Sequence, residues 1–205
     1  MHALPVRLLG LIAFLCLGLA GCASSKLVNE WSNPEYRSVH FSNVLVIGVS
    51  TQASVRRRFE DELVAKLKAA GVDAAPSYRY IAEDGKVDEA RISEAVKQAQ
   101  ADAVIITRLV RVDKKTEVIP GVYQPAPAIT VGLYPGYSAA WLGYYEPPRI
   151  REYDVFVSET SLYDVARNQL VWTGTVQTAN PGNIDKEIRR YVDLVIKAMK
   201  DKKIL

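Results

Sequence analysis

The N-terminal segment constrains the fold most, because it separates a leader from the part of the chain that can fold. Basic residues at His2 and Arg7 precede an apolar run from Leu8 to Ala20, and small residues then lead to Cys22. This order is typical of an export signal, which is removed from the mature protein. The apolar run is shorter than the ~20 residues that a transmembrane helix requires. Residues 1–21 are therefore predicted to be a signal peptide outside the fold.

The sequence Leu19-Ala20-Gly21-Cys22 resembles the lipobox of bacterial lipoproteins. This resemblance implies that the Cys22 thiol receives diacylglycerol, that cleavage occurs before it, and that the new amino group is acylated. Several acyl chains anchor a protein stably, whereas one binds only marginally. The absence of aspartate after the cysteine resembles outer-membrane sorting. We therefore expect a lipid-anchored protein on the outer membrane, facing the periplasm. An inner-membrane location and an ordinary secretory signal remain the alternatives.

Composition excludes several kinds of site. Cys16 leaves with the leader and Cys22 carries the lipid, so no thiol remains for a disulfide, a metal site or catalysis. Removing 21 residues from 205 leaves 184, a length that suits one domain. The formal net charge of +3 is spread along the chain, whereas a nucleic-acid partner requires a concentrated basic surface. We therefore expect no nucleic-acid partner.

Hydrophobic periodicity predicts an irregular tether over residues 22–42 and one α+β domain over residues 43–205. The domain is expected to be a mixed sheet of about five strands with helices packed on it, in the order β-α-β-α-β-(insert)-β-β-α. Predicted strands cover 44–49, 72–80, 103–112, 151–164 and 169–178. Apolar stripes predict helices over 55–70, 92–99 and 184–199, the last capped by Asn183.

The insert from residue 118 to 149 differs in composition from the rest of the chain, with six prolines and six Tyr or Trp residues. Loops this long are usually functional or disordered. Tyr and Trp are enriched at binding hot spots and at membrane interfaces. The insert is therefore a candidate partner-binding surface, and the alternatives are cover for one edge of the domain's own sheet or a disordered loop. The candidate residues are Tyr123, Tyr134, Tyr137, Trp141, Tyr144 and Tyr145.

Arg56, Arg57 and Arg58 fall in the first turn of the predicted helix over residues 55–70. The helix dipole disfavours positive charge there, which invites a specific reason for three arginines. One hypothesis is an anionic ligand held by the helix N-terminus and the guanidinium groups, such as a phosphate, a lipid head group or an acidic partner. The alternative hypothesis is that the arginines pair with acidic neighbours such as Glu60 or Glu62.

The sequence carries no recognisable catalytic motif. His40 is the one histidine after the leader, and it has no nucleophile context. No strand-turn nucleophile motif, phosphate-binding glycine loop or pair of histidines at metal spacing occurs. We therefore expect no enzyme, no metal and no cofactor beyond the lipid on Cys22. Glycosidase carboxylates brought together from distant segments remain an alternative, because spacing alone does not test them.

The element order behind the lipobox, with Leu162-Tyr163-Asp164 and Leu170-Val171-Trp172-Thr173-Gly174, is similar to periplasmic lipoprotein modules related to the amino-terminal domain of TolB. CsgG-like and LpoB-like lipoproteins share that shape. The resemblance implies a non-catalytic binding or assembly module at the cell envelope. One alternative is a subunit of an oligomeric secretion or pore assembly, in which the insert supplies a membrane-spanning hairpin. The other alternative is an envelope glycan hydrolase. The sequence leaves the partner and the oligomeric state open.

Overall fold

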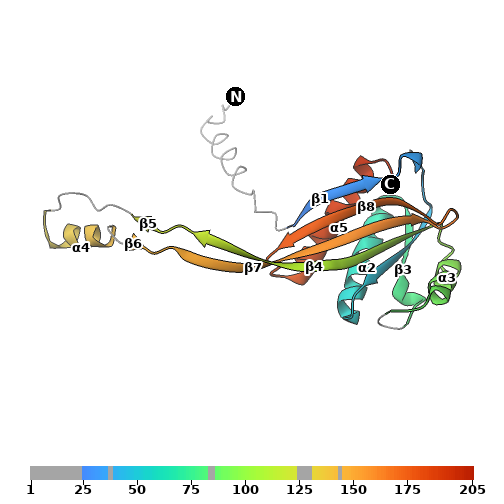
Figure 1. Ribbon diagram of the computed structural model, residues 1–205, viewed down its shortest axis with the longest axis horizontal. Coiled ribbons are helices and arrows are strands. Elements are labelled where there is room, and N and C mark those ends of the chain that lie inside the picture. Colours follow the sequence, from blue (N-terminus) through green and yellow to red (C-terminus); the bar gives the residue numbers. More distant parts are fainter. Residues whose placement is uncertain (1–24, 37–38, 83–85, 124–130, 143–144) are drawn as a thin grey trace, which may run out of the picture.

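The computed structural model describes residues 25–36, 39–82, 86–123, 131–142 and 145–205. This part of the chain forms a folded body and a long arm that projects from one end of it (Figure 1). The body contains a six-stranded sheet in the order β1-β8-β7-β4-β2-β3. The predicted α+β class with a mixed sheet is confirmed, and the sheet has one strand more than expected.

The sheet mixes parallel and antiparallel pairs. The strand β2 lies parallel to both β3 and β4, and the other neighbours in the sheet are antiparallel. The strands are β1 (Ser25–Ser32), β2 (Asn43–Val49), β3 (Asp73–Pro76), β4 (Ala103–Ile119), β7 (Arg149–Asp164) and β8 (Gln169–Ala179). The helices are α2 (Ala53–Ala69), α3 (Glu89–Gln98), α4 (Leu133–Leu142) and α5 (Ile184–Asp201). Short strands β5 (Val122–Tyr123) and β6 (Tyr145–Glu146) form a separate pair, and 3-10 turns cover Pro34–Tyr36 and Ser77–Arg79.

The central strand β2 is buried on both faces, as its unbroken apolar run predicts. Val44 and Val46 point into the main core, which α2 and α5 complete. Leu45 points the other way, into a second cluster with Ala95 and Ala99 around α3. The helices therefore cover both faces of this part of the sheet, and they enclose a core large enough for the body to fold without a disulfide.

The prediction of an irregular tether over residues 22–42 is wrong for the segment Ser25–Ser32. This segment is the edge strand β1, paired antiparallel with β8 from Ser25 opposite Thr178 to Ser32 opposite Trp172. Its sequence has little apolar alternation, and Leu27 alone packs against the core from its centre. The strand therefore depends on hydrogen bonds to the free edge of β8, which local pattern does not reveal.

Two other predicted strands have different bounds. The strand expected over residues 72–80 ends at Pro76 and continues as the 3-10 turn Ser77–Arg79. The strand expected over 103–112 continues to Ile119, two residues into the predicted insert. Its continuation carries many charged residues, so hydrophobic pattern gave no sign of it. Within the described part of the insert, only residues 118–119 and 149 extend the six-stranded sheet, and the rest includes the separate pair of β5 and β6 and the helix α4.

The ring of Trp172 occupies the space next to Gly174 in β8, where a larger residue would have its Cβ. The Trp172 side chain is fully buried, and its ring lies over the Cα of Gly174, two residues further along the same face of the strand. A Cβ added at Gly174 would lie within 2.6 Å of Trp172 Cζ2 and 3.3 Å from Leu27 Cδ1. A glycine is thus required for the indole ring to lie flat under β1.

Gly174→Ala is expected to lower the free energy of unfolding by about 1–3 kcal/mol, because the methyl group overpacks the Trp172 ring. Gly182→Ala is the matched control, since a Cβ there meets no atom within 4 Å. Its effect should be within about 0.5 kcal/mol. Urea unfolding of the two variants measures both values. Equal stabilities would mean that the ring does not occupy this position.

Candidate functional site

The arm is formed by the outer parts of β4 and β7. These two strands stay paired from Ala103 opposite Asp164 to Ile119 opposite Arg149. Their other neighbours end earlier: β2 at the pair Val49–Arg108, and β8 at the pair Ala179–Val155. Beyond the pair Asp113–Val155, β4 and β7 therefore continue alone as a two-stranded ribbon outside the body (Figure 1).

An irregularity marks the place where the arm leaves the sheet. The register of β4 against β7 shifts between Leu109 and Arg111, so Val110 is an extra residue in β4. Such a bulge bends a strand and increases its twist, and bulges are common where a strand leaves its sheet. The bulge lies directly after the last pair with β2, so it redirects β4 away from the body.

The shaft of the arm, defined as residues 113–117 with residues 151–154, carries charge on both faces. Lys114 faces Asp154 and Glu117 faces Arg151 across the ribbon, so opposite charges oppose each other. Successive strand residues point to opposite faces, and these two pairs therefore lie on different faces. The Arg151 guanidinium also lies 5.7 Å from the centre of the Tyr153 ring. The charged side chains of the shaft are therefore suited to contact with water on both faces of the ribbon.

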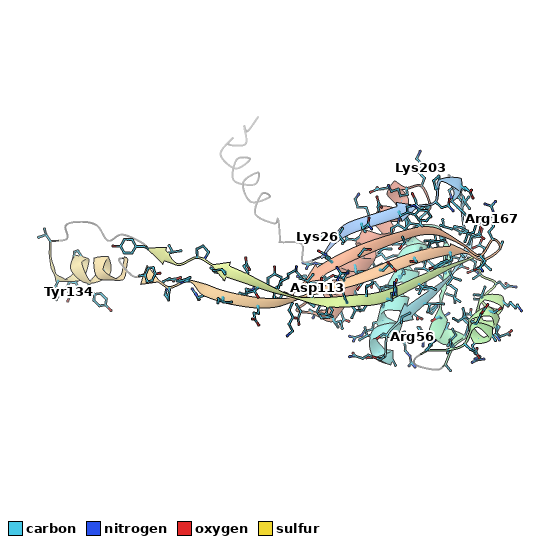
Figure 2. All side chains as sticks on the ribbon, in the orientation of Figure 1. Lys26, Arg56, Asp113, Tyr134, Arg167 and Lys203 are labelled. Atoms are coloured by element: carbon cyan, nitrogen blue, oxygen red, sulfur yellow. The ribbon has the colours of Figure 1, made fainter. Side chains whose placement is uncertain are left out.

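The tip of the arm, defined as residues 118–150, has the opposite character. Its described part holds ten of the eighteen exposed large apolar side chains in the described chain. On α4 and just before it, Val131, Leu133 and Tyr134 are 89%, 81% and 83% exposed. Figure 2 places Tyr134 at the far end of the arm, away from the body. The ten residues are Val118, Ile119, Val122, Tyr123, Val131, Leu133, Tyr134, Tyr137, Tyr145 and Ile150.

Four of the six predicted aromatic residues are placed on this surface. Tyr123 on β5, Tyr134 and Tyr137 on α4, and Tyr145 on β6 are all exposed. They lie on the arm, so they do not cover an edge of the body's sheet. The backbone of Trp141 belongs to α4, but its side chain and all of Tyr144 lie outside the described residues. The binding role of the aromatic residues stays a prediction.

The absence of charged residues marks the tip in the sequence, although the prediction of the insert rested on its prolines and aromatic residues. The 28 residues from 118 to 145 contain no Asp, Glu, Lys or Arg, whereas charged residues make up 24% of the whole chain. Glu117 and Glu146 bound this stretch. A search for charge-free segments would therefore have identified the tip as a unit, including Val131 and Leu133, which a search for aromatic residues missed.

The three arginines on α2 point to three different partners. The Arg56 side chain is buried, and its Nε donates to Glu60 Oε1 at 3.1 Å. The Arg57 guanidinium lies 5.8 Å from the centre of the Tyr78 ring, and Arg58 Nη1 donates to Asp185 Oδ1 at 2.8 Å. Consecutive helical residues diverge in this way, so the three groups do not converge on one anion. Arg56 thus pairs with Glu60, and its Nη2 also donates to Ser77 Oγ at 2.9 Å.

Glu60 is the centre of a buried polar network at the end of β2. Its side chain has no exposed surface. Its carboxylate accepts hydrogen bonds from four donors. Oε1 accepts from Arg56 Nε at 3.1 Å, from the Gly48 amide at 2.9 Å and from Ser77 Oγ at 2.7 Å. Oε2 accepts from the Tyr78 amide at 3.1 Å. The network ties α2 to β2 and to the turn after β3.

Asp164, the last residue of the Leu162-Tyr163-Asp164 segment, has a structural role at the opposite end of the body. Its side chain accepts a hydrogen bond from the Tyr36 hydroxyl at 3.0 Å and one from the Arg167 amide at 3.1 Å. Arg167 in turn lies over the Tyr36 ring, 5.3 Å from its centre. These contacts close the turn between β7 and β8 and attach the segment after β1 to it.

Two further observations concern the residues that the structure describes. In that part of the chain, no three His, Cys, Asp or Glu side chains gather where they could hold a metal ion. Within the same ranges, no helix has both the length and the apolar character needed to cross a bilayer. The predicted signal peptide and the predicted lipidation residue Cys22 lie outside the described residues.

No family model matches the chain, and no curated protein matches it. Among solved structures, it is similar to the PelC dodecamer from Paraburkholderia phytofirmans at 12% identity and a TM-score of 0.46, over 88% of this chain and 99% of that one. It is also similar to lipoprotein GNA1162 from Neisseria meningitidis at 12% identity and a TM-score of 0.41, over 78% and 99%. A PDZ domain protein from Parabacteroides distasonis gives 10% identity and 0.39, over 92% and 39%. Likenesses this distant carry no argument about function.

Proposed function

We propose that the chain is a lipid-anchored, non-catalytic module of the cell envelope that engages another envelope component through the tip of its arm. The observation that carries this proposal is the arm itself. A ribbon with a charged shaft holds an apolar surface away from the folded body. The shaft exposes mainly charged side chains, which are well solvated by water, whereas an exposed apolar surface usually marks an interaction site.

The anchor is proposed from the lipobox-like sequence that ends at Cys22. A diacylglyceryl group and an N-acyl chain on this cysteine would hold the body at the membrane, and the absence of aspartate at Ala23 and Ser24 would favour the outer membrane with the body in the periplasm. The tether and the arm then have separate tasks. The lipid keeps the protein at the membrane surface, and the arm makes the specific contact.

The alternative of a membrane-spanning hairpin receives less support from the shaft. A strand that faces lipid needs an uninterrupted apolar face, and charged residues in lipid are costly. The two faces of the shaft carry the pairs Lys114–Asp154 and Glu117–Arg151. The open edges of the ribbon do leave room for pairing with a second copy. Assembly of several copies through their arms is therefore the second candidate function.

The alternative of a glycan hydrolase would require two carboxylates that face one cleft. The two buried carboxylates among the described residues are Glu60 and Asp164. Glu60 lies beside Gly48 near the end of β2, whereas Asp164 pairs with Ala103 at the start of β4. Each one accepts hydrogen bonds from its own neighbours. The two buried carboxylates therefore do not face one cleft. A surface hollow between α2 and α5 is lined by Asp61, Glu62 and Asp185, and in it Asp185 pairs with Arg58.

Site-specific photo-crosslinking in intact cells tests the proposed function. A photoreactive residue at Tyr134 is expected to form adducts with a defined envelope component, because this side chain stands at the outer end of the arm. The control is the same residue at Lys200, an exposed position near the C-terminal end of α5. It should give no such adduct. Equal patterns at both positions, or no adduct at Tyr134, would overturn the proposal.

A further inference from the structure

The first described residue lies at the end of the body from which the arm leaves. Ser25 pairs with Thr178 on β8, Thr178 pairs with Phe156 on β7, and Phe156 pairs with Val112 on β4. These four residues form one row across the sheet. The shaft begins one residue after Val112, and Figure 2 shows Lys26 and Asp113 near this same end of the body.

Covalent geometry then limits where the lipid can be. Cys22 is three residues before Ser25, and three extended residues span at most about 11 Å. Ser25 lies three strand spacings from Val112, or about 14 Å at ~4.8 Å for each spacing. A lipid on Cys22 therefore places a membrane surface within about 25 Å of Val112 at the root of the arm.

The chemistry of the tip fits the interface of a bilayer. The stretch 118–145 has no charged residue, so it pays no cost for transferring an ion out of water. Its described exposed large apolar side chains are Val, Leu, Ile and Tyr, and tyrosine is enriched at the level of the lipid head groups. Charged residues resume at Glu117 on one strand and at Glu146 on the other, where Glu146 pairs with Arg149 at the base of the tip.

We propose that the tip inserts into the interfacial region of the same bilayer that holds the Cys22 lipid. This inference rests on the proposed function and names a lipid surface as the component that the tip contacts. The protein would then be attached at two points, and the second point fixes the orientation of the body. A single lipid on a short tether does not fix it.

The lengths of the arm and the tether set the geometry of this attachment. The strand from Val112 to Ile119 extends seven residues, or about 23 Å at ~3.3 Å for each residue. This is longer than the ~11 Å that residues 22–25 can span. The arm therefore lies inclined to the membrane plane, with the shaft in water and among the head groups and the tip in the interface.

The cysteine content of the mature chain allows a direct test. Cys16 and Cys22 are the two cysteines of the sequence, so a mature chain with Cys22→Ser has none. In that chain, Tyr134→Cys carries an environment-sensitive fluorophore at the tip. Vesicles of phosphatidylethanolamine and phosphatidylglycerol are added, with and without lipids that carry a doxyl quencher. Thr116→Cys in the shaft and Lys200→Cys on the body give the matched control labels.

The label at position 134 is expected to shift its emission to the blue and to be quenched by the doxyl lipids. The labels at 116 and 200 should remain unquenched by lipids with deep doxyl groups. Binding should survive a rise to about 0.5 M salt, because charge-free contacts are not screened. A label at 134 that remains in water at saturating lipid would overturn the inference. Binding that disappears with salt would also overturn it.

A pair of double variants gives a second, independent readout by vesicle flotation. Leu133→Asp with Tyr134→Asp should weaken vesicle binding about 10-fold or more, since two apolar side chains leave the interface and two charges enter it. Trp31→Asp with Val165→Asp removes one exposed aromatic and one exposed aliphatic side chain near the other end of the body. This control should bind vesicles as the parent does. Equal losses in both variants would contradict the inference.

The two proposals fail in different ways. If the tip ignores vesicles but forms a protein adduct from Tyr134 in cells, the lipid inference is wrong and the proposed binding module stands. If the tip neither enters vesicles nor forms any adduct, both proposals are wrong. If it enters vesicles and the adduct in cells is a lipid, both are supported.

Discussion

Glu60→Ala is expected to lower the free energy of unfolding by about 3–5 kcal/mol, because it removes the carboxylate that pairs with the buried Arg56 guanidinium. Arg56 and Glu60 are 5% and 0% exposed. The substitution also removes the acceptor of the Gly48 and Tyr78 amides. Buried donors without an acceptor add to the cost. Chemical denaturation followed by circular dichroism measures the change.

The control for this prediction is Asp193→Ala, which removes the carboxylate of an exposed ion pair. Asp193 Oδ1 lies 2.7 Å from Lys66 Nζ, and both side chains are well exposed. Pairs of this kind contribute about 0–1 kcal/mol. A Glu60→Ala variant as stable as Asp193→Ala would show that Glu60 does not hold α2 against β2.

Replacing residues 119–149 by Asn-Gly is expected to abolish the adducts formed by the arm while leaving the body intact. Val118 and Ile150 lie opposite each other in the ribbon, so a two-residue turn can join them. The described residues of the tip belong to neither core cluster. The free energy of unfolding should therefore change by no more than about 0.5 kcal/mol. Retention in the membrane through Cys22 should persist.

Crosslinking with a bifunctional reagent in intact cells measures the effect of this replacement. Crosslinked species that form with the parent chain should be absent when the shortened chain replaces it. The Leu133→Asp, Tyr134→Asp variant keeps the length of the arm, so it separates loss of the apolar surface from a change of shape. Unchanged crosslinked species, or a loss of stability of about 2 kcal/mol or more, would contradict the account of the arm as an independent element.

The sequence predicted those elements whose buried side chains recur with the period of a strand or a helix. The apolar run of β2 and the stripe of α5 are examples, and Asn183 caps α5 as expected by accepting from the Lys186 amide at 3.0 Å. The hairpin of β7 and β8 follows from two β-rich runs and a short polar turn. Such elements carry their own signal, because local residues make the contacts that stabilise them.

The elements that sequence pattern missed are stabilised by partners far away in the chain. The strand β1 depends on the edge of β8, 153 residues away at the pair Ser25–Thr178. The outer part of β4 has charged residues on both faces and is stabilised by pairing with β7, so no apolar alternation marks it. The sequence alone does not decide between the two hypotheses for Arg56. Its burial next to Ser77 depends on the packing of α2 against the turn that follows β3.

The sequence predicted which segment carries the candidate binding surface, but it did not predict that this segment forms the end of an arm. The aromatic residues of the insert identified the right segment, and the charged shaft that holds them away from the body was not foreseen. Shape depends on the register of β4 against β7, which a bulge at Val110 modifies. A bulge has no reliable signature in a single sequence.

Mass spectrometry of the N-terminal peptide from membrane-purified protein shows whether a lipid on Cys22 holds this arm-bearing body at a membrane. We expect a peptide that begins at Cys22 and carries a diacylglyceryl thioether with an N-acyl chain. A peptide that retains residues before Cys22, or that has a free thiol at this position, would rule out the lipid anchor.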